Sequence, residues 1–299
     1  MTDRGLTDNT CGLILKRYSG FYYVQGTTGA LFECKLRGKV KDGVILVGDR
    51  VRFTQTGEGQ GIIEEVLPRT VELIRPAIAN VNQVMLVMSF DQPAPNLKLL
   101  DRLLILIEHL DLPTVIVLNK CDLPGNRTIE TISEYYQRIG YPVILTSTTM
   151  CIGLSQLLAA MSDKITVIAG PSGVGKTSLL NLLVPGRELK TGQVSRKLGR
   201  GKHTTRHVEL FPLSSGGWVA DTPGFTVVDN PLIKREDLSR LFIEFGVSAE
   251  RCRFMDCLHS GEVECGIKDA VEDGTILASR YQNYLTILTE VIERERCYR

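Results

Sequence analysis

One stretch constrains this chain more than any other. A β-branched run, a glycine-bearing loop and a helix-forming segment follow one another over residues 165–180, and the loop fits G-x-x-x-x-G-K-[ST] at every fixed position. Its glycines let the backbone wrap a phosphate with successive N–H groups pointing inward, and the following helix adds its positive N-terminal end. Lys176 is placed to reach β- and γ-phosphates, and the Thr177 hydroxyl to ligate Mg²⁺. We assign the phosphate contacts to a continuous run: Gly170, Pro171, Ser172, Gly173, Val174, Gly175, Lys176, Thr177 and Ser178.

Length and composition limit the classes of protein to which this chain can belong. With 299 residues the chain is long enough for two or three domains, and a hydrophobic fraction of 43% suffices for buried cores. The net charge of +1 excludes a uniformly basic nucleic-acid binder and an acidic tail protein, so charge has to be read locally. No apolar run reaches the length of a membrane span, and residues 2–9 lack a signal-peptide core. We therefore expect a monomeric, cytoplasmic protein with no membrane partner.

The first 75 residues indicate a small β-barrel of the oligonucleotide-binding type. Short segments of strand character are separated by glycine or charged turns, and several of them alternate. Phe21, Tyr22 and Tyr23 lie among basic residues, as in barrels that stack the bases of single-stranded nucleic acid. The alternative is that the aromatic side chains fill the barrel and the charges form its solvated face. The residues alone leave both open. The expected strands cover residues 12–16, 20–25, 30–36, 50–55 and 61–66.

Beyond a segment at residues 68–76 that has the composition of a linker, the pattern changes to alternating strands and helices. Near-continuous apolar runs predict strands buried on both faces, as in an α/β sheet that is mostly parallel with helices on its faces. We expect an N-terminal barrel at residues 1–75, an α/β nucleotide-binding domain at 76–230 and a helical domain at 231–299. Before the phosphate loop, strands are expected at residues 83–90, 114–118 and 142–146, and helices at 96–110, 129–139 and 153–162.

The second of these strands ends in Asn119-Lys120-Cys121-Asp122, an N-K-x-D pattern that reads guanine. The Asp122 carboxylate can accept from guanine N1–H and from the exocyclic amine, whereas adenine offers no donors there and would leave the carboxylate unpaired. Asn119 can bond the base and brace the phosphate loop, and the stem of Lys120 can lie along the base. The tetrapeptide alone would equally suit a capping turn. Beside a complete phosphate loop, it predicts GTP and GDP as ligands.

A basic, glycine-punctuated segment follows the phosphate loop at residues 187–208. It holds seven basic residues against one acidic residue, a local charge of +6. A basic loop beside a nucleotide is typical of a switch that meets phosphate-rich partners. Either Thr204 or Thr205 can bind Mg²⁺ and the γ-phosphate, which would order the loop only in the triphosphate state.

The next strand ends in a D-x-x-G pattern, Asp221 to Gly224. Asp221 suits a role near Mg²⁺, and the Gly224 N–H can sense the γ-phosphate. The following residue is Phe225, where many GTPases carry a water-orienting glutamine. The sequence therefore predicts weak intrinsic hydrolysis or a polar group supplied from elsewhere. His203 is the candidate within the chain, and a basic-loop contact to RNA or solvent is the alternative role for it.

The C-terminal region carries three thiols and one imidazole within one short loop. Soft thiolates and an imidazole at this spacing supply a closed tetrahedral zinc site, which can hold together a segment with little core. One structural Zn²⁺ per chain is expected here, bound by Cys252, Cys257, His259 and Cys265.

The order of the motifs along the chain is unusual. In most GTPases the phosphate loop precedes N-K-x-D, but here N-K-C-D comes first and D-T-P-G follows the loop. The order is circularly permuted, which a compact domain tolerates because its termini often lie close together. The segment after D-T-P-G then leads directly into the cysteine-bearing region.

Taken together, these motifs resemble the ribosome small-subunit-dependent GTPase A family of bacteria over nearly the whole chain. The resemblance rests on NKCD (119–122), GPSGVGKTS (170–178), GRGKHTTRHVEL (199–210), DTPGF (221–225) and CRFMDCLHSGEVEC (252–265). It implies a GTPase that is stimulated by the small (30S) ribosomal subunit and acts late in its maturation, with a barrel and a zinc domain that both touch the 16S rRNA.

The resemblance also assigns roles to single residues. Phe225 matches the hydrophobic residue that these GTPases carry in place of the catalytic glutamine, and the family's switch histidine corresponds to His203. In the turn after the third strand only Ser147 is transferable as a base contact. Two other functions stay open: a GTPase that acts on tRNA or a protein partner, and an RNA-binding protein in which nucleotide only sets the conformation.

Overall fold

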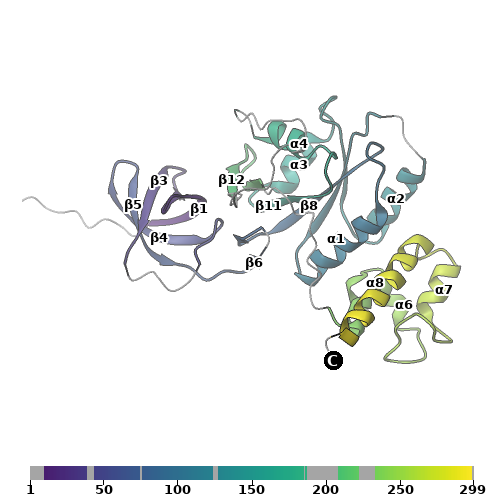
Figure 1. The fold of residues 1–299 in the computed structure, drawn as a ribbon. Helices are drawn as coiled ribbons and strands as arrows, with labels where there is room; N and C mark the ends of the chain where they lie inside the picture. Colours follow the sequence, from purple (N-terminus) through teal and green to yellow (C-terminus); the bar gives the residue numbers. More distant parts are fainter. Residues whose placement is uncertain are drawn as a thin grey trace, which may run out of the picture. The chain divides into compact units, whose positions relative to one another are not determined.

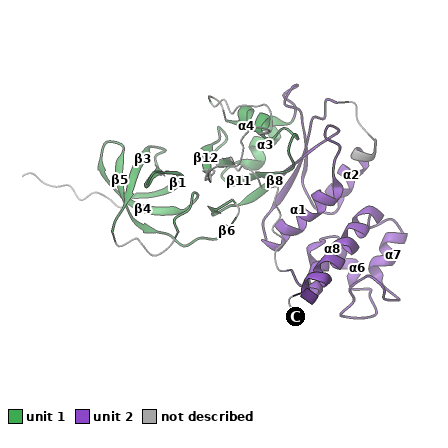
Figure 2. Cartoon of the chain, in the orientation of Figure 1, with its two compact units in different colours: residues 1–85, 153–225 green, residues 86–152, 226–299 purple. Residues whose placement is uncertain are grey.

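The computed structural model shows two compact units, each made from two separate parts of the chain (Figures 1 and 2). Unit 1 comprises residues 1–85 and 153–225, and unit 2 comprises residues 86–152 and 226–299. The residues that the structure describes are 10–38, 44–74, 76–123, 127–184, 186, 208–221 and 233–297.

Unit 1 begins with a closed five-stranded barrel. Its strands pair in the order β1-β2-β3-β5-β4, and β4 returns to β1, so the sheet has no free edge. The expected barrel and its five strands are confirmed. Their bounds are β1 Thr10–Tyr18, β2 Phe21–Gly26, β3 Leu31–Leu36, β4 Arg50–Gly57 and β5 Gln60–Val66.

Alternating apolar side chains fill the barrel. Ile14, Val24 and Phe53 are fully buried, because every second residue of a strand points inward. Tyr22 is also buried, at 8% exposure, whereas the hydroxyl of its neighbour Tyr23 donates to Glu33 on the next strand. Tyr22 therefore belongs to the filling of the barrel and is not available for stacking a base.

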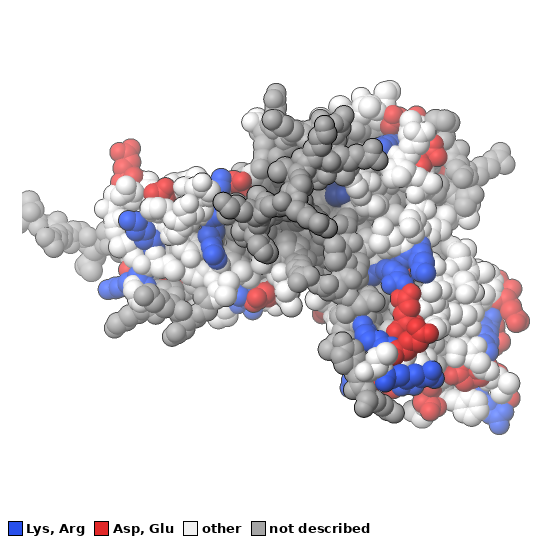
Figure 3. All heavy atoms as spheres, in the orientation of Figure 1, with Lys and Arg blue, Asp and Glu red and all other residues white. Residues whose placement is uncertain are grey.

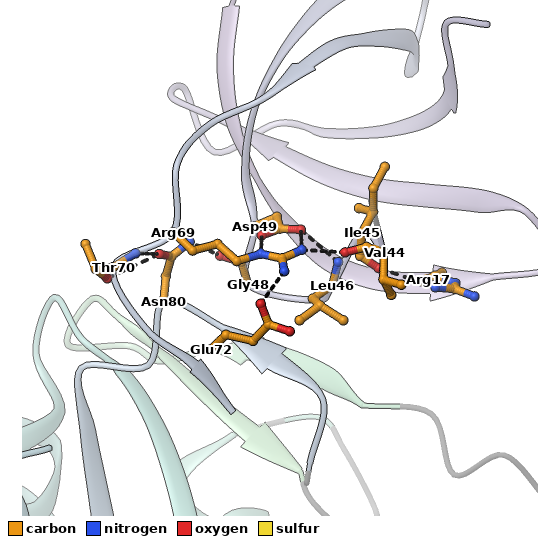
Figure 4. A network of polar contacts seen from close by, with 10 residues as sticks. All are labelled: Arg17, Val44, Ile45, Leu46, Gly48, Asp49, Arg69, Thr70, Glu72 and Asn80. Carbon is orange, nitrogen blue, oxygen red and sulfur yellow. Dashed lines mark hydrogen bonds and ion pairs between the residues drawn. The ribbon is translucent and has the colours of Figure 1, made fainter. Parts of the chain in front are cut away.

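The segment between the barrel and the α/β part differs from the expected free linker. It contains a short hairpin, β6 Glu72–Leu73 and β7 Ile78–Ala79, and it is bound to the barrel by Arg69 (Figure 4). The Arg69 guanidinium donates from Nε and Nη2 to the two oxygens of buried Asp49, at 2.7 and 2.9 Å. Asn80 adds bonds to Thr70 N and Gly48 O, both of 2.9 Å. Composition indicated a linker because these partners are distant in sequence.

The rest of unit 1 is α/β structure. It consists of the start of β8 and of the elements on either side of the phosphate loop. Strand β11 pairs parallel with β13, and β13 pairs antiparallel with β12. Buried Gln83, at the start of β8, donates to Thr166 Oγ1 on β11 at 2.9 Å. The bounds are β8 Gln83–Ser89, α3 Leu154–Met161, β11 Ile165–Ala169, α4 Lys176–Leu183, β12 Glu209–Pro212 and β13 Trp218–Asp221.

Unit 2 contains the remainder of β8 and the parallel pair β9 and β10, whose ends carry the predicted base-reading turns. Every residue of β9 is buried, as the continuous apolar run predicts for a strand with helices on its faces. Asn96 caps helix α1, because its side chain accepts from Leu99 N at 3.0 Å. The expected strand–helix alternation is confirmed. The bounds are α1 Leu97–His109, β9 Thr114–Asn119, α2 Arg127–Arg138 and β10 Val143–Thr146.

The C-terminal part of unit 2 is helical, and its last helix ends at Cys297. An aromatic cluster forms its core: Phe242 stacks on Phe245 at 5.0 Å between ring centroids, and Tyr284 meets both rings edge-on. The bounds are α5 Arg235–Leu238, the 3-10 helix η1 Ser239–Leu241, α6 Phe245–Ala249, α7 Gly266–Glu272 and α8 Ala278–Cys297.

A buried ion cluster joins α8 to the rest of unit 2. Arg280 and Asp101 are each 1% exposed, and Arg280 Nη1 donates to Asp101 Oδ1 at 2.5 Å. Glu244 accepts from two other nitrogens of the same guanidinium, one of them at 3.1 Å. Although burial alone lowers it, the two carboxylates hold the pKa of Arg280 above its ordinary value, so the side chain stays charged.

The described surface carries both signs of charge. Figure 3 shows Lys and Arg side chains interspersed with Asp and Glu on the face drawn. Among the helices of the described residues, none is both long and apolar enough to cross a membrane.

Candidate functional site

The phosphate loop has the backbone that its sequence predicts. Strand β11 is buried along its whole length and ends at Ala169, where the loop begins. The loop's three glycines have φ of 137°, 84° and 98°, values that other residues rarely adopt. Helix α4 begins directly after the last of them, at Lys176, so its free N–H groups face the loop. Buried Val174 anchors the loop from below, whereas Ser172 and Thr177 are exposed.

Lys176 is bonded to its own loop. Its Nζ donates to the carbonyl oxygens of Gly170 at 2.8 Å and Pro171 at 2.6 Å. Burial lowers the pKa of this ammonium group. These two carbonyl oxygens are its partners among the described residues. A half-buried cation in such a setting has a strong preference for an anion, and a phosphate in the loop would supply one.

Asp221 ends β13 beside the phosphate loop. The partner of Ala220 is Val167 in the parallel pair, so Asp221 and the start of the loop lie at the same edge of this sheet. This is the edge at which α/β proteins bind ligands. The other predicted residues of the switch region, which are His203, Thr204, Thr205 and Gly224, lie outside the described residues, as does the side chain of Asp221.

The residues of unit 2 that the sequence predicts to read the base come together at the ends of β9 and β10. Asn119 is fully buried, and its Oδ1 accepts from Thr146 Oγ1 at 3.0 Å, which fixes the orientation of the amide. Lys120 has a left-handed backbone, with φ of 66°, and its Nζ donates to Gln92 O. The chain therefore turns sharply after the strand, and the three predicted readers Asn119, Lys120 and Asp122 follow one another at the sheet edge.

A network of hydroxyl groups orients Asp122. Thr149 Oγ1 donates to Asp122 Oδ2 at 2.8 Å and lies 2.9 Å from Ser147 Oγ. Ser147 Oγ in turn accepts from Met150 N at 3.1 Å, so the turn itself holds the hydroxyl in place. Hydrogen bonds from Ser147 and Thr149 hold the pKa of the Asp122 carboxyl below its ordinary value. Sequence reasoning found Ser147 but missed Thr149, since only the fold of the turn places it against the carboxylate.

Four predicted metal ligands lie together in the C-terminal loop. The sulfur atoms of Cys252, Cys257 and Cys265 and a ring nitrogen of His259 lie within 4.8 Å of one another. His259 Nδ1 is 3.4 Å from Cys252 Sγ and 3.5 Å from Cys265 Sγ. His259 is 3% exposed and burial lowers its pKa, so its imidazole is neutral and has a lone pair to offer.

The donor set fits a tetrahedral zinc ion. With Zn–S bonds of about 2.3 Å, ligand atoms at the corners of a tetrahedron are separated by about 3.8 Å. The two sulfur atoms of Cys252 and Cys265 are 3.9 Å apart, close to that edge. Burial raises the pKa of Cys257 to about 12 and also raises that of Cys265. Buried thiols crowded in this way gain most from a divalent cation, which stabilises their thiolate forms.

Helix α8 holds the cysteine loop from outside. Tyr281 Oη donates to His259 O and Tyr284 Oη donates to Leu258 O, both at 2.7 Å. Within the loop, the Glu262 carboxylate accepts from Leu258 N and Ser260 N at 2.8 Å. The sequence did not identify these supports as part of the site, because the tyrosines lie 22 and 26 positions beyond the carbonyls that they bind.

The phosphate loop, the N-K-x-D turn that precedes it in the chain and the strand order define a circularly permuted GTPase with an N-terminal barrel and a C-terminal helical, metal-ligating part. Family models agree: the RsgA GTPase model matches residues 66–231, and the RsgA N-terminal domain model matches residues 11–63. The chain belongs to the RsgA GTPase family, and it is a GTP-hydrolysing enzyme.

Curated relatives and solved structures are similar to this chain over almost its full length. The small ribosomal subunit biogenesis GTPase RsgA of Moorella thermoacetica is 47% identical over 96% of this chain and 99% of its own. That of Alkaliphilus metalliredigens is 46% identical over 95% and 99%. The crystal structure of YjeQ from Thermotoga maritima superposes with a TM-score of 0.83 at 38% identity, covering 95% of this chain and 99% of its own. YloQ, described as a circularly permuted GTPase, gives the same TM-score and identity over 98% and 99%.

The hydroxyl network generates a prediction for Thr149. Thr149→Val removes the donor to Asp122 and keeps the shape of the side chain, so we expect GTP and GDP binding to weaken by about fivefold. Because the pKa of Asp122 rises when the donor is lost, binding should also fall at a higher pH on acidification than in the wild type. Titration of a fluorescent GDP analogue between pH 4 and pH 7 measures both effects.

Thr148→Val is the matched control, because Thr148 lies in the same turn and has no side-chain partner among the described residues. It should leave affinity and pH profile unchanged. Asp122→Asn sets the upper limit for the loss of guanine-nucleotide binding, and it should also abolish the preference for GTP over ATP. Equal behaviour of the two valine variants would contradict the role of Thr149.

Proposed function

We propose that this GTPase is a checkpoint in late maturation of the small ribosomal subunit, and that this subunit stimulates its GTP hydrolysis. The observation that carries the proposal is the combination of a GTPase core with a barrel and a metal-ligating module in one chain, shared over nearly full length with relatives named for small-subunit biogenesis. The proposed partners are the small subunit with its 16S rRNA, GTP and GDP. We propose that the protein acts as a monomer in the cytoplasm.

The proposed roles at the nucleotide follow from the geometry of each turn. Residues 170–178 hold the phosphates through the loop's N–H groups, and Lys176 exchanges its two loop carbonyls for phosphate oxygens. Asn119, Lys120, Asp122 and Ser147 bind guanine. The residues proposed to hold Mg²⁺, which neutralises phosphate charge when bound, are Thr177, Thr204 or Thr205, and Asp221. Gly224 is proposed to sense the γ-phosphate.

We propose that His203 orients the attacking water or stabilises charge, because the residue after Gly224 is Phe225 and offers no polar group. The surrounding segment 187–208 has a local charge of +6, which suits contact with RNA phosphates. Binding of the subunit would bring this segment into its active conformation, so turnover would depend on the partner. The proposed domain boundaries are residues 1–75, 76–230 and 231–299.

The test is GTP turnover with and without purified small subunits. We expect turnover to rise by more than about tenfold, or about 1.4 kcal/mol of barrier, when small subunits are added. Large subunits and tRNA serve as controls and should have no effect. Stimulation by tRNA alone, or turnover that is independent of the subunit, would favour a different GTPase function.

The same assay tests His203. His203→Ala should bind GTP normally and lose most of the subunit-stimulated rate, because the substitution removes the polar group but no nucleotide contact. His207→Ala, in the same segment, is the matched control. Unchanged stimulated turnover in His203→Ala would remove the proposed role.

We also propose that the four ligands Cys252, Cys257, His259 and Cys265 hold one structural Zn²⁺. Elemental analysis of purified protein should give about one zinc per chain, and Cys257→Ser should lower both zinc content and the melting temperature. Cys297→Ser, which changes an exposed thiol outside the cluster, should change neither. A folded C-terminal part without metal would contradict the assignment.

A further inference from the structure

A cavity that the nucleotide site does not use lies in unit 1. It is open between the barrel and the beginning of β13, and its volume is about 370 Å³. This volume is at the lower end of the range of roughly 300–1,000 Å³ that small-molecule sites occupy. Its walls carry one basic residue and no acidic residue, and they are Cys11, Gly12, Leu13, Gln25, Gly26, Thr27, Gly29, Arg50, Leu67 and Trp218.

Trp218 forms one wall of the cavity and is the only tryptophan of the chain. Its indole Nε1 donates to Gln25 Oε1 on β2 at 2.9 Å, and the side chain is half-buried. The hydrogen bond uses the indole's one donor and fixes the ring against the barrel. A half-buried indole with its polar atom already paired offers the cavity an aromatic surface in a fixed orientation.

Arg50 supplies the positive charge. The other described basic residues of the barrel are engaged: Lys16 pairs with Glu209, Arg37 with Glu64 and Arg52 with Glu65, Arg17 bonds Ile45 O, and Lys35 lies over the ring of Phe21. The side chain of Arg50 is exposed and has no hydrogen bond or ion pair within residues 10–38 and 44–74 or elsewhere in the described chain. Its guanidinium is therefore available for an anion.

We propose that this cavity binds one nucleotide of single-stranded RNA, with the phosphate on Arg50 and the base against Trp218. The two groups at the wall match the two parts of a nucleotide, since guanidinium groups bind phosphate and bases stack on aromatic rings. A nucleotide within a strand carries one negative charge, which a single arginine balances, whereas a free mononucleotide carries close to two. The single positive charge of the wall therefore favours a nucleotide within an RNA strand over a free mononucleotide.

The site deepens the proposed function, because it gives the barrel's RNA contact a location. The proposed cavity is not the base-stacking barrel face that the sequence suggests around Phe21, Tyr22 and Tyr23. Tyr22 is in the core and the hydroxyl of Tyr23 is bound to Glu33. Trp218, by contrast, comes from the α/β part, three residues before Asp221 at the end of the same strand.

The test uses the fluorescence of Trp218 in the full chain saturated with GDP. Titration with a single-stranded hexauridylate should quench the emission saturably. Arg50→Gln should weaken binding by about tenfold and lower the salt slope of log K by about 0.7, the value for one lost phosphate contact on a single strand. Arg52→Gln is the matched control, because Arg52 lies on the same β-strand but outside the cavity. The affinity of this variant for hexauridylate and its salt slope should stay near those of the wild type.

Trp218→Phe removes the signal, so its binding is measured by anisotropy of labelled hexauridylate and should be about tenfold weaker because the stacking surface shrinks. Melting temperatures of all variants establish that they are folded. Equal affinities of wild type and Arg50→Gln, or quenching by uridine monophosphate as strong as by the hexamer, would overturn the proposal. The binding assay uses no ribosomes and measures no GTP turnover. A negative result would therefore leave the proposal of subunit-stimulated hydrolysis intact, and a failure of that proposal would leave the RNA site intact.

Discussion

The guanidinium of Arg280 is the group on which the C-terminal half of the molecule depends. Moving a charge of this kind out of water costs several kcal/mol, and the structure offsets that cost with the carboxylates of Asp101 and Glu244 and with the rings of Tyr136 and Phe242, whose centroids lie 5.3 and 5.0 Å away. The residue lies in the first turn of α8, and Asp101 lies on α1. The ion cluster therefore binds the last helix of the chain to the first helix of unit 2.

This connection has a consequence for the function. Helix α8 carries Tyr281 and Tyr284, whose hydroxyls hold the backbone of the cysteine loop, while α1 belongs to the same unit as the turns that contain Asn119 and Asp122. The permuted order makes this possible, because the chain reaches the metal-ligating module directly after D-T-P-G. The predicted base-reading turns and the metal-ligating module belong to one compact unit, and the phosphate loop belongs to the other. The metal-ligating module and the turns at Asn119 and Asp122 thus share one unit, which the Arg280 cluster helps to hold together.

The sequence predicted the fold and the local motifs because each depends on neighbouring residues. The glycines of the phosphate loop, the N-K-x-D turn and the four metal ligands each lie within one short segment, and their spacing carries the chemistry. The residues that support these motifs could not be found in this way. Asp101 and Arg280 are 179 positions apart, and Gln25 and Trp218 are 193 apart, so only the folded chain brings them into contact. Composition alone indicates a linker around Arg69 for the same reason, because its partner Asp49 is 20 positions upstream.

We expect α1, the turns at Asn119 and Asp122 and the metal-ligating module to unfold as one body, because Arg280 links α8 to α1. Native-state hydrogen exchange of the wild type and Arg280→Ala, both with metal bound, tests it directly. Removing one partner of a buried ion cluster leaves uncompensated charge, so amides in α1 and α8 should lose protection together, by about 3–5 kcal/mol. Loss of protection in α8 alone, with α1 as protected as in the wild type, would contradict the account.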